Sequence, residues 1–153
     1  MKLSKNSSRA LICTGALLAL SAFGLQHLVA ATTARNQAIE QAMQQMNEAI
    51  KVLGKGVNAE NRAASLDELA KFQTALMAAK SQTPDSAEKI EEKQRPAFVN
   101  EFRKQLIEGM QFSLNAEIAI VDGKYKEADT LIRNKLGALK SAGHSKFKPD
   151  EGK

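Results

Sequence analysis

The last predicted helix of the chain, Gly123–Phe147, reads GKYKEADTLIRNKLGALKSAGHSKF. Its apolar residues recur at the spacing of one helix in a small bundle and are expected to face inward: Ala128, Leu131, Ile132, Leu136 and Leu139. The same stretch contains His144, the only histidine outside the first thirty residues. Any chemistry that needs an imidazole in the folded domain therefore has to use His144.

The start of the chain has the three parts of a secretory signal peptide. These are a basic start (Lys2, Lys5 and Arg9), an apolar run (Ala10–Leu25) and small residues before a cleavage site (Val29–Ala31). The uncharged run is shorter than the roughly twenty residues that a membrane span needs, so we favour cleavage, near Ala30 or Ala31, over a retained anchor. The chain then divides into a signal peptide, residues 1–31, and an exported domain, residues 32–153.

Export limits the chemistry of the domain. The loss of Cys13 removes the only cysteine, which excludes disulfides, thiolate metal sites and covalent haem attachment through a C-x-x-C-H motif. Without the three basic residues of the signal peptide, the exported domain has 19 basic and 17 acidic residues, which gives a net charge of +2. This weak charge, with one tyrosine and no tryptophan, predicts no nucleic-acid partner. We expect a periplasmic protein with no stable membrane association after cleavage.

Four amphipathic helices are predicted, near residues 34–53, 65–83, 96–122 and 124–147. Glycines end the first helix. Capping-box spacing at Ser65–Glu68 marks the second helix, which can also begin a turn earlier. Pro96 suits the first turn of the third, and the charged stretch Ser86–Gln94 before it is interpreted as the one long loop. The predicted fold is all-α, an up-down-up-down antiparallel four-helix bundle.

The first three predicted helices each carry an inward apolar stripe. These stripes are Ile39, Met43, Met46, Ile50 and Leu53, then Leu66, Leu69, Phe72, Leu76 and Ala79, then Val99, Phe102, Leu106, Gly109, Ser113, Ala116 and Ile120. The third helix has a second, adjoining stripe, which predicts burial over a wide face: Ile107, Met110, Leu114, Ile118 and Val121. Met77 and Met110 are interpreted as core residues.

Sequence patterns of common enzymes are missing. The chain has no Gly-rich phosphate loop, no Ser/His/Asp arrangement and no Glu-x-x-His di-metal motif. A single histidine in the exported part also excludes zinc sites that need several. We therefore predict that the protein is not an enzyme.

Met43 and His144 are the residues with the most specific chemistry to offer. In an antiparallel bundle the start of the first helix lies beside the end of the fourth, so both residues fall at one end. A thioether and a neutral imidazole form an axial pair for haem iron. The alternatives stay open at this level, because a methionine on a helical stripe is usually core and a histidine near a helix end is usually solvated.

Further patches of sequence favour the interpretation of Met43 and His144 as an axial pair for haem iron. In chain order they are Met43-x-x-Met46-x-x-x-Ile50-Lys51-Val52-Leu53, Asp67-x-Leu69-x-Lys71 continuing through Ala75, Ala79 and Thr83-Pro84, Phe102-Arg103, Gly123-Lys124-x-Lys126-Glu127-Ala128, and His144-x-Lys146-Phe147. In these patches the exported domain resembles the soluble periplasmic cytochrome b-562 family, a four-helix bundle with one non-covalent haem b. The resemblance covers essentially the whole exported domain.

The resemblance implies a function and a site. Met43 and His144 would be the axial ligands of the haem iron, Phe102 a pocket wall, Met46 and Leu106 wall residues, and Lys140 a residue near the haem edge. The function would be one-electron transfer by a monomer to an unknown redox partner protein. The alternative is a haem-free exported bundle that acts as a binding or stress-adaptor module.

The chain departs from the family pattern near the histidine. One extra residue lies between Gly123 and Leu136, so the phase of the last helix must adjust before His144. Lys140 replaces an arginine, and Leu106 replaces a second pocket aromatic. Gly143 directly precedes His144, and a glycine costs about 1 kcal/mol of helix relative to alanine. This predicts a loosened helix end around the histidine.

Overall fold

The computed structural model describes residues 20–147, with side-chain burial from residue 37 on. The chain divides into two compact units, residues 1–34 and 35–153, and the description that follows concerns the second. The predicted signal peptide lies mostly outside the described residues. Among residues 20–147, no helix combines the length and the apolar content of a membrane span.

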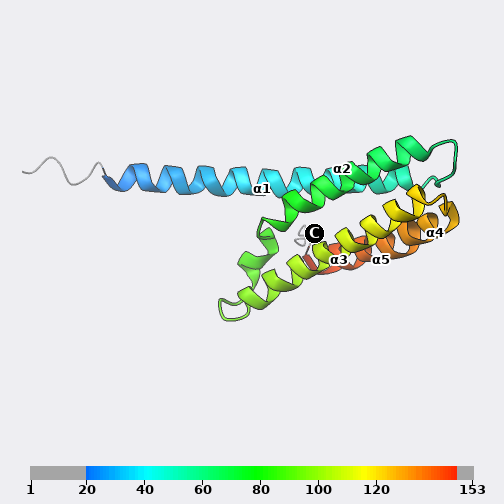
Figure 1. The fold of residues 1–153 in the computed structure, drawn as a ribbon. Coiled ribbons are helices and arrows are strands. Elements are labelled where there is room, and N and C mark those ends of the chain that lie inside the picture. The colour runs from blue at the N-terminus through cyan, green and yellow to red at the C-terminus, as the bar shows by residue number, and fades with distance from the viewer. Residues whose placement is uncertain (1–19, 148–153) are drawn as a thin grey trace, which may run out of the picture. The chain divides into compact units, whose positions relative to one another are not determined.

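The described part of the chain is all-helical, as predicted, and contains no strand. Its elements in order are α1 (Leu20–Leu53), α2 (Arg62–Lys80), the short 3₁₀ helix η1 (Asp85–Lys89), α3 (Arg95–Val121), α4 (Tyr125–Thr130), the π-helix η2 (Leu131–Leu136) and α5 (Gly137–Phe147), shown in Figure 1. The segments α4, η2 and α5 follow one another without a break and are called the last helix below. The described residues thus form a four-helix protein.

The ends of the helices follow the turn residues. α1 ends at Leu53, as predicted, and Gly56 takes φ of 111°, a conformation that favours glycine. α3 ends in a Schellman motif, in which Lys124 N–H donates to Ala119 O at 2.8 Å and Gly123 has φ of 73°. The start of α1 differs from the prediction, since the helix extends back to Leu20 through alanine- and leucine-rich sequence.

The capping-box interpretation of Ser65 was wrong, and the earlier start is the one observed. α2 begins at Arg62, so Ser65 lies inside the helix and its hydroxyl donates to Asn61 Oδ1 at 3.2 Å. The turn before the helix is held by asparagines, because Asn61 Oδ1 also accepts the backbone N–H of Asn58 at 2.8 Å.

The predicted long loop is partly structured. η1 lies within it, and Ser86 and Ala87 are buried. Arg95 supports this segment from the first turn of α3, because its Nε donates to Ala87 O at 3.0 Å. The interpretation of Ser86–Gln94 as one long loop was therefore wrong for residues 86–89, which belong to η1.

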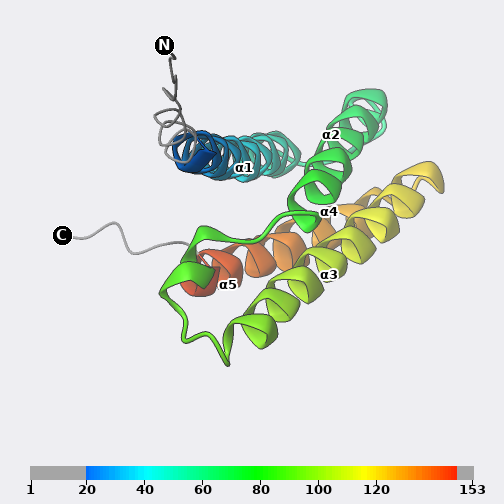
Figure 2. The ribbon, with the colours of Figure 1, turned by 90° about the vertical axis from the view of Figure 1, so that its left-hand side faces the viewer.

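α3 is the helix that the others pack against. α2, α4, η2 and α5 all bring their backbones close to it, and Figures 1 and 2 both show α3 running beside the last helix. Residues 35–53 of α1 make only scattered close backbone approaches and reach the core through side chains, including Ile39, Met46 and Leu53. The inward stripes predicted for the first three helices supply most of the core residues.

The prediction of a wide buried face on α3 was wrong. Its first stripe is buried except for half-buried Val99, but Ile107, Leu114, Ile118 and Val121 of the second stripe are 40%, 44%, 59% and 57% exposed. Met77, predicted as core, is 53% exposed on α2. Three neighbours already cover the first stripe of α3, and no described element packs over the second.

Candidate functional site: a pocket between α1 and the other helices

A pocket of about 840 Å³ lies where α1 stands away from its neighbours. Its apolar lining comes from all four helices: Ile39, Met46, Ile50, Phe72, Leu76, Phe102, Leu106, Leu136, Leu139 and Phe147. The volume falls within the roughly 300–1,000 Å³ that is usual for small-molecule and cofactor sites. The pocket is therefore large enough to hold a small molecule or a cofactor.

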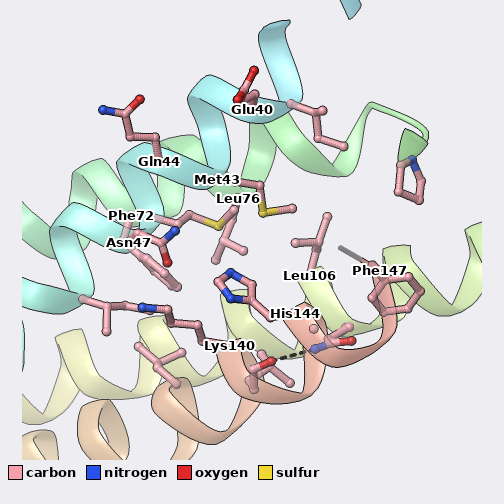
Figure 3. A pocket seen from close by; sticks show the side chains of 18 of the residues that line it. Glu40, Met43, Gln44, Asn47, Phe72, Leu76, Leu106, Lys140, His144 and Phe147 are labelled. Atoms are coloured by element: carbon pink, nitrogen blue, oxygen red, sulfur yellow. Dashed lines mark hydrogen bonds between the residues drawn. The ribbon is translucent and has the colours of Figure 1, made fainter. Parts of the chain in front are cut away.

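All six residues predicted for the site line this pocket: Met43, Met46, Phe102, Leu106, Lys140 and His144. The half-buried side chain of Met43 extends from α1, and the exposed side chain of His144 extends from α5. Both point into the pocket from facing helices, as Figure 3 shows. One space thus offers a thioether on one side and an imidazole on the other.

The pocket walls are closed by apolar side chains. Phe102, Leu106 and Met46 are 3%, 7% and 7% exposed, which suits wall residues. Phe147, which the sequence placed only in the patch that ends in His144-x-Lys146-Phe147, packs edge-on against Phe102 with ring centroids 5.2 Å apart. Among the described residues, no buried side-chain nitrogen or oxygen lacks a hydrogen-bond partner. The walls therefore present apolar surface to whatever enters.

The π-helix η2 changes the phase of the last helix before His144. Ala128 and Phe147 are both buried, although nineteen residues in an ideal α-helix would place them about 100° apart around the axis. A π turn accommodates one additional residue within an α-helix and so restores the phase. The phase change predicted before His144 is found at Leu131–Leu136.

Gly143 has a packing role that the sequence did not reveal. Gln105 on α3 donates from Nε2 to Leu139 O at 2.7 Å, and a Cβ at Gly143 would meet the same Nε2 at 2.8 Å. The glycine therefore lets the α3 side chain lie across α5 immediately beside His144. Instead of only loosening this end of the helix, Gly143 takes part in a hydrogen-bonded contact that holds it.

A second contact holds the end of α5. The buried hydroxyl of Ser86 donates to Phe147 O at 2.8 Å, so η1 satisfies a carbonyl that the helix end leaves open. Phe98 adds an edge-on contact to Phe147 at 5.1 Å, and Lys146 pairs with Glu101 at 2.5 Å. The roles of Ser86 and Gln105 could not be predicted from the sequence, because contacts between residues distant in sequence leave no local pattern.

The rim of the pocket is polar. It includes Glu40, Gln44, Asn47, Glu48, Lys51, Asp85 and Lys140. Gln44 Nε2 donates to Glu48 Oε1 at 2.9 Å, and Lys140 is half-buried. Away from the pocket, hydrogen bonds to Glu68 and Asp122 raise the pKa values of Lys71 and Lys124. A ligand with an apolar body and charged edge groups would suit this combination of walls and rim.

Comparison with known proteins adds no family. No protein-family model matches the chain, and no curated protein matches it significantly. Within the described residues, no cluster of three or more His, Cys, Asp or Glu side chains could hold a metal ion. The pocket and the chemistry of the side chains that line it are therefore the features that indicate a function.

Proposed function

We propose that the exported domain binds one haem b per chain, non-covalently, with Met43 and His144 as the axial ligands of the iron. The observation that supports this most is the shared pocket, which both residues line from facing helices. Methionine and histidine together are the axial pair of electron-transfer cytochromes. The proposed activity is one-electron transfer with a redox partner protein, without substrate turnover.

The residues present suit this group. The walls are apolar and include Phe72, Phe102 and Phe147, which fits a flat macrocycle. Lys140 at the rim brings positive charge for the carboxylates of the haem edge. The carboxylates among the lining residues are Glu40, Glu48 and Asp85, and Figure 3 shows Glu40 pointing away from His144.

The side chains define what kind of haem protein this would be. Haem supplies the one-electron chemistry when bound, and the protein supplies ligands, orientation and a dry surrounding. With Met43 and His144 as its two ligands, the haem iron would have no free coordination site for oxygen or a substrate. A methionine ligand raises the reduction potential. Apolar walls around the bound group would favour its form of lower charge.

The proposal extends to topology and location. An up-down-up-down antiparallel arrangement places the start of the mature first helix beside the end of the last, where the pocket residues of α1 and α5 lie. A basic start and a short apolar run support a signal peptide at residues 1–31 and a periplasmic location. The redox partner would act in the same compartment.

Titration with haem tests this proposal. The protein, isolated in its exported form, is expected to bind one equivalent of haem and to give sharp, split visible bands on reduction. His144→Ala is expected to remove six-coordination, and Met43→Ala to alter the spectrum while haem stays bound more weakly. Met77→Ala is the matched control, because Met77 is an exposed methionine outside the pocket.

Two results would overturn the proposal. One is the broad spectrum of free haem with the unchanged protein, which would favour a haem-free binding module. The other is a bound spectrum that neither His144→Ala nor Met43→Ala changes, since the haem would then occupy a different place.

A further inference from the structure

An apolar stripe on α3 has no partner among the described residues. Ile107, Leu114, Ile118 and Val121 lie along this stripe, and each is at least 40% exposed. Half-buried Met110 lies on its edge. Monomeric proteins seldom leave such a row of large apolar side chains in water, and rows of this kind commonly mark an interaction surface.

This α3 stripe is separate from the haem pocket proposed above. Phe102 and Leu106 of α3 line the pocket, whereas at 3.6 residues per turn the stripe lies roughly 130° around the helix from the buried face. A ligand in the pocket therefore does not cover the stripe. An occupant has to approach from the opposite side of α3.

We propose that the α3 stripe pairs with the same stripe of a second copy of this chain, antiparallel, about a two-fold axis at Leu114. A two-fold interface requires that residue i face j and that j face i. The stripe has this symmetry, because Ile107 and Val121 lie seven residues on either side of Leu114, and Met110 and Ile118 lie four. Antiparallel pairing thus sets every apolar residue against another.

The spacing suits helix-to-helix contact along the whole stripe. Ile107, Leu114 and Val121 repeat every seven residues, which is the repeat that keeps one seam facing a partner helix. Gln111 and Glu117 flank the seam three residues on either side of Leu114, so across the axis an amide faces a carboxylate that also accepts a hydrogen bond from Gln73 Nε2 at 2.7 Å. In a parallel pair Glu117 would face Glu117 of the other copy.

Charges at the ends also favour the antiparallel sense. Arg103 and Lys104 precede the stripe, and Asp122 follows it. Antiparallel pairing places Arg103 and Lys104 of one copy beside the Asp122–Lys124 ion pair of the other, so each end carries three basic side chains and one carboxylate. Parallel pairing would instead gather four basic side chains at one end.

The size of the stripe sets the expected strength. Its side chains and their flanks expose on the order of 500 Å² per chain, so two copies reach about the 1,000 Å² that a specific interface needs. This is the low end of the range for stable interfaces. The expected assembly is therefore a dimer that dissociates on dilution, in place of the monomer predicted from the sequence.

Sedimentation velocity over a concentration series tests the dimer with the protein in its exported form. Leu114→Asp would set two carboxylates against each other at the axis and is expected to raise the dissociation constant at least 100-fold. Val52→Asp is the matched control, because Val52 is 43% exposed on α1 and lies outside the pocket. Circular dichroism establishes that both variants keep their helices.

A cysteine placed at the axis tests the register. In the exported form, which lacks Cys13, Leu114→Cys is expected to form a disulfide-linked dimer under air oxidation, and Val52→Cys is not. A protein that stays monomeric at millimolar concentration would overturn the proposal and point to another occupant of the stripe. Self-association that Leu114→Asp leaves unchanged, or equal cross-linking at both positions, would overturn it too.

Discussion

Two halves of this bundle are built differently. In the packed half, where α3 meets α2 and the last helix, small buried residues let the backbones come close, among them Gly109, Ala116 and Ala128. In the open half, residues 35–53 of α1 face the others across a pocket of about 840 Å³. The core is therefore tightly packed on one side of the bundle and lines a pocket on the other.

The difference distinguishes the half of the bundle that we expect to determine its stability from the half that we expect to bind a ligand. Gly109 shows how the packed half is fitted, because a Cβ there would meet Leu139 Cδ2 at 3.1 Å and Leu76 Cδ2 at 3.4 Å. Protein interiors are normally filled to this density. The pocket side is not, so we expect its stability to depend on a ligand.

The largest expected effect is in the packed half. Leu69 on α2 is fully buried, so Leu69→Ala should lower the free energy of unfolding by about 3 kcal/mol, from lost burial and a new cavity. The loss should be the same with and without haem. Urea unfolding followed by circular dichroism measures it, with Leu106→Ala as comparison, because deleting a pocket-wall residue only widens existing space. Equal losses at the two sites would remove the distinction between the halves.

The next effect belongs to the open half. Haem in a 100-fold excess over its dissociation constant should stabilise the native protein by about 2.7 kcal/mol, because it binds the folded and not the unfolded chain. His144→Ala should reduce this gain sharply at the same haem concentration. Thermal unfolding with and without haem measures the gain. An undiminished gain in His144→Ala would separate haem binding from the proposed ligand.

The contact between η1 and the end of α5 should contribute less. Ser86→Ala would leave the Phe147 carbonyl without its buried donor and should cost about 1.5 kcal/mol. It should also weaken haem binding severalfold, because α5 carries His144. Ser81→Ala is the matched control, since Ser81 makes an exposed, local bond to Ala78 O at 2.8 Å. If both variants bind haem like the native protein, the contact does not position the histidine.

The smallest effect concerns Gly143. Alanine is about 1 kcal/mol better than glycine in a helix, but here its Cβ would displace the Gln105 amide from Leu139 O. Gly143→Ala should therefore be nearly neutral alone and stabilising by about 1 kcal/mol in a Gln105→Ala background. Urea unfolding of the four proteins of this cycle measures the coupling. Equal effects in both backgrounds would contradict a role for Gly143 in this contact.

Much of this architecture could be predicted from the sequence, because helix periodicity and turn residues are local signals. The end of α1 at Leu53 and the turn at Gly123 follow from them. The exposure of the second stripe of α3 could not be predicted, because periodicity shows that a face is apolar but not whether another element covers it. Sequence patterns predicted that Met43 and His144 lie in one site. The roles of Gln105 and Ser86 could not be predicted, because these residues act through contacts with residues far away in the sequence.

The most direct measurement of the central claim is the NMR spectrum of the methionine methyl groups, labelled with ¹³C, before and after addition of haem and reduction. Ring currents of the macrocycle shift the methyl group of an axial methionine far upfield. The proposed site predicts that Met43 alone makes this shift, with Met77 unmoved. A shift of Met46 in its place, or no such shift with haem bound, would contradict ligation by Met43.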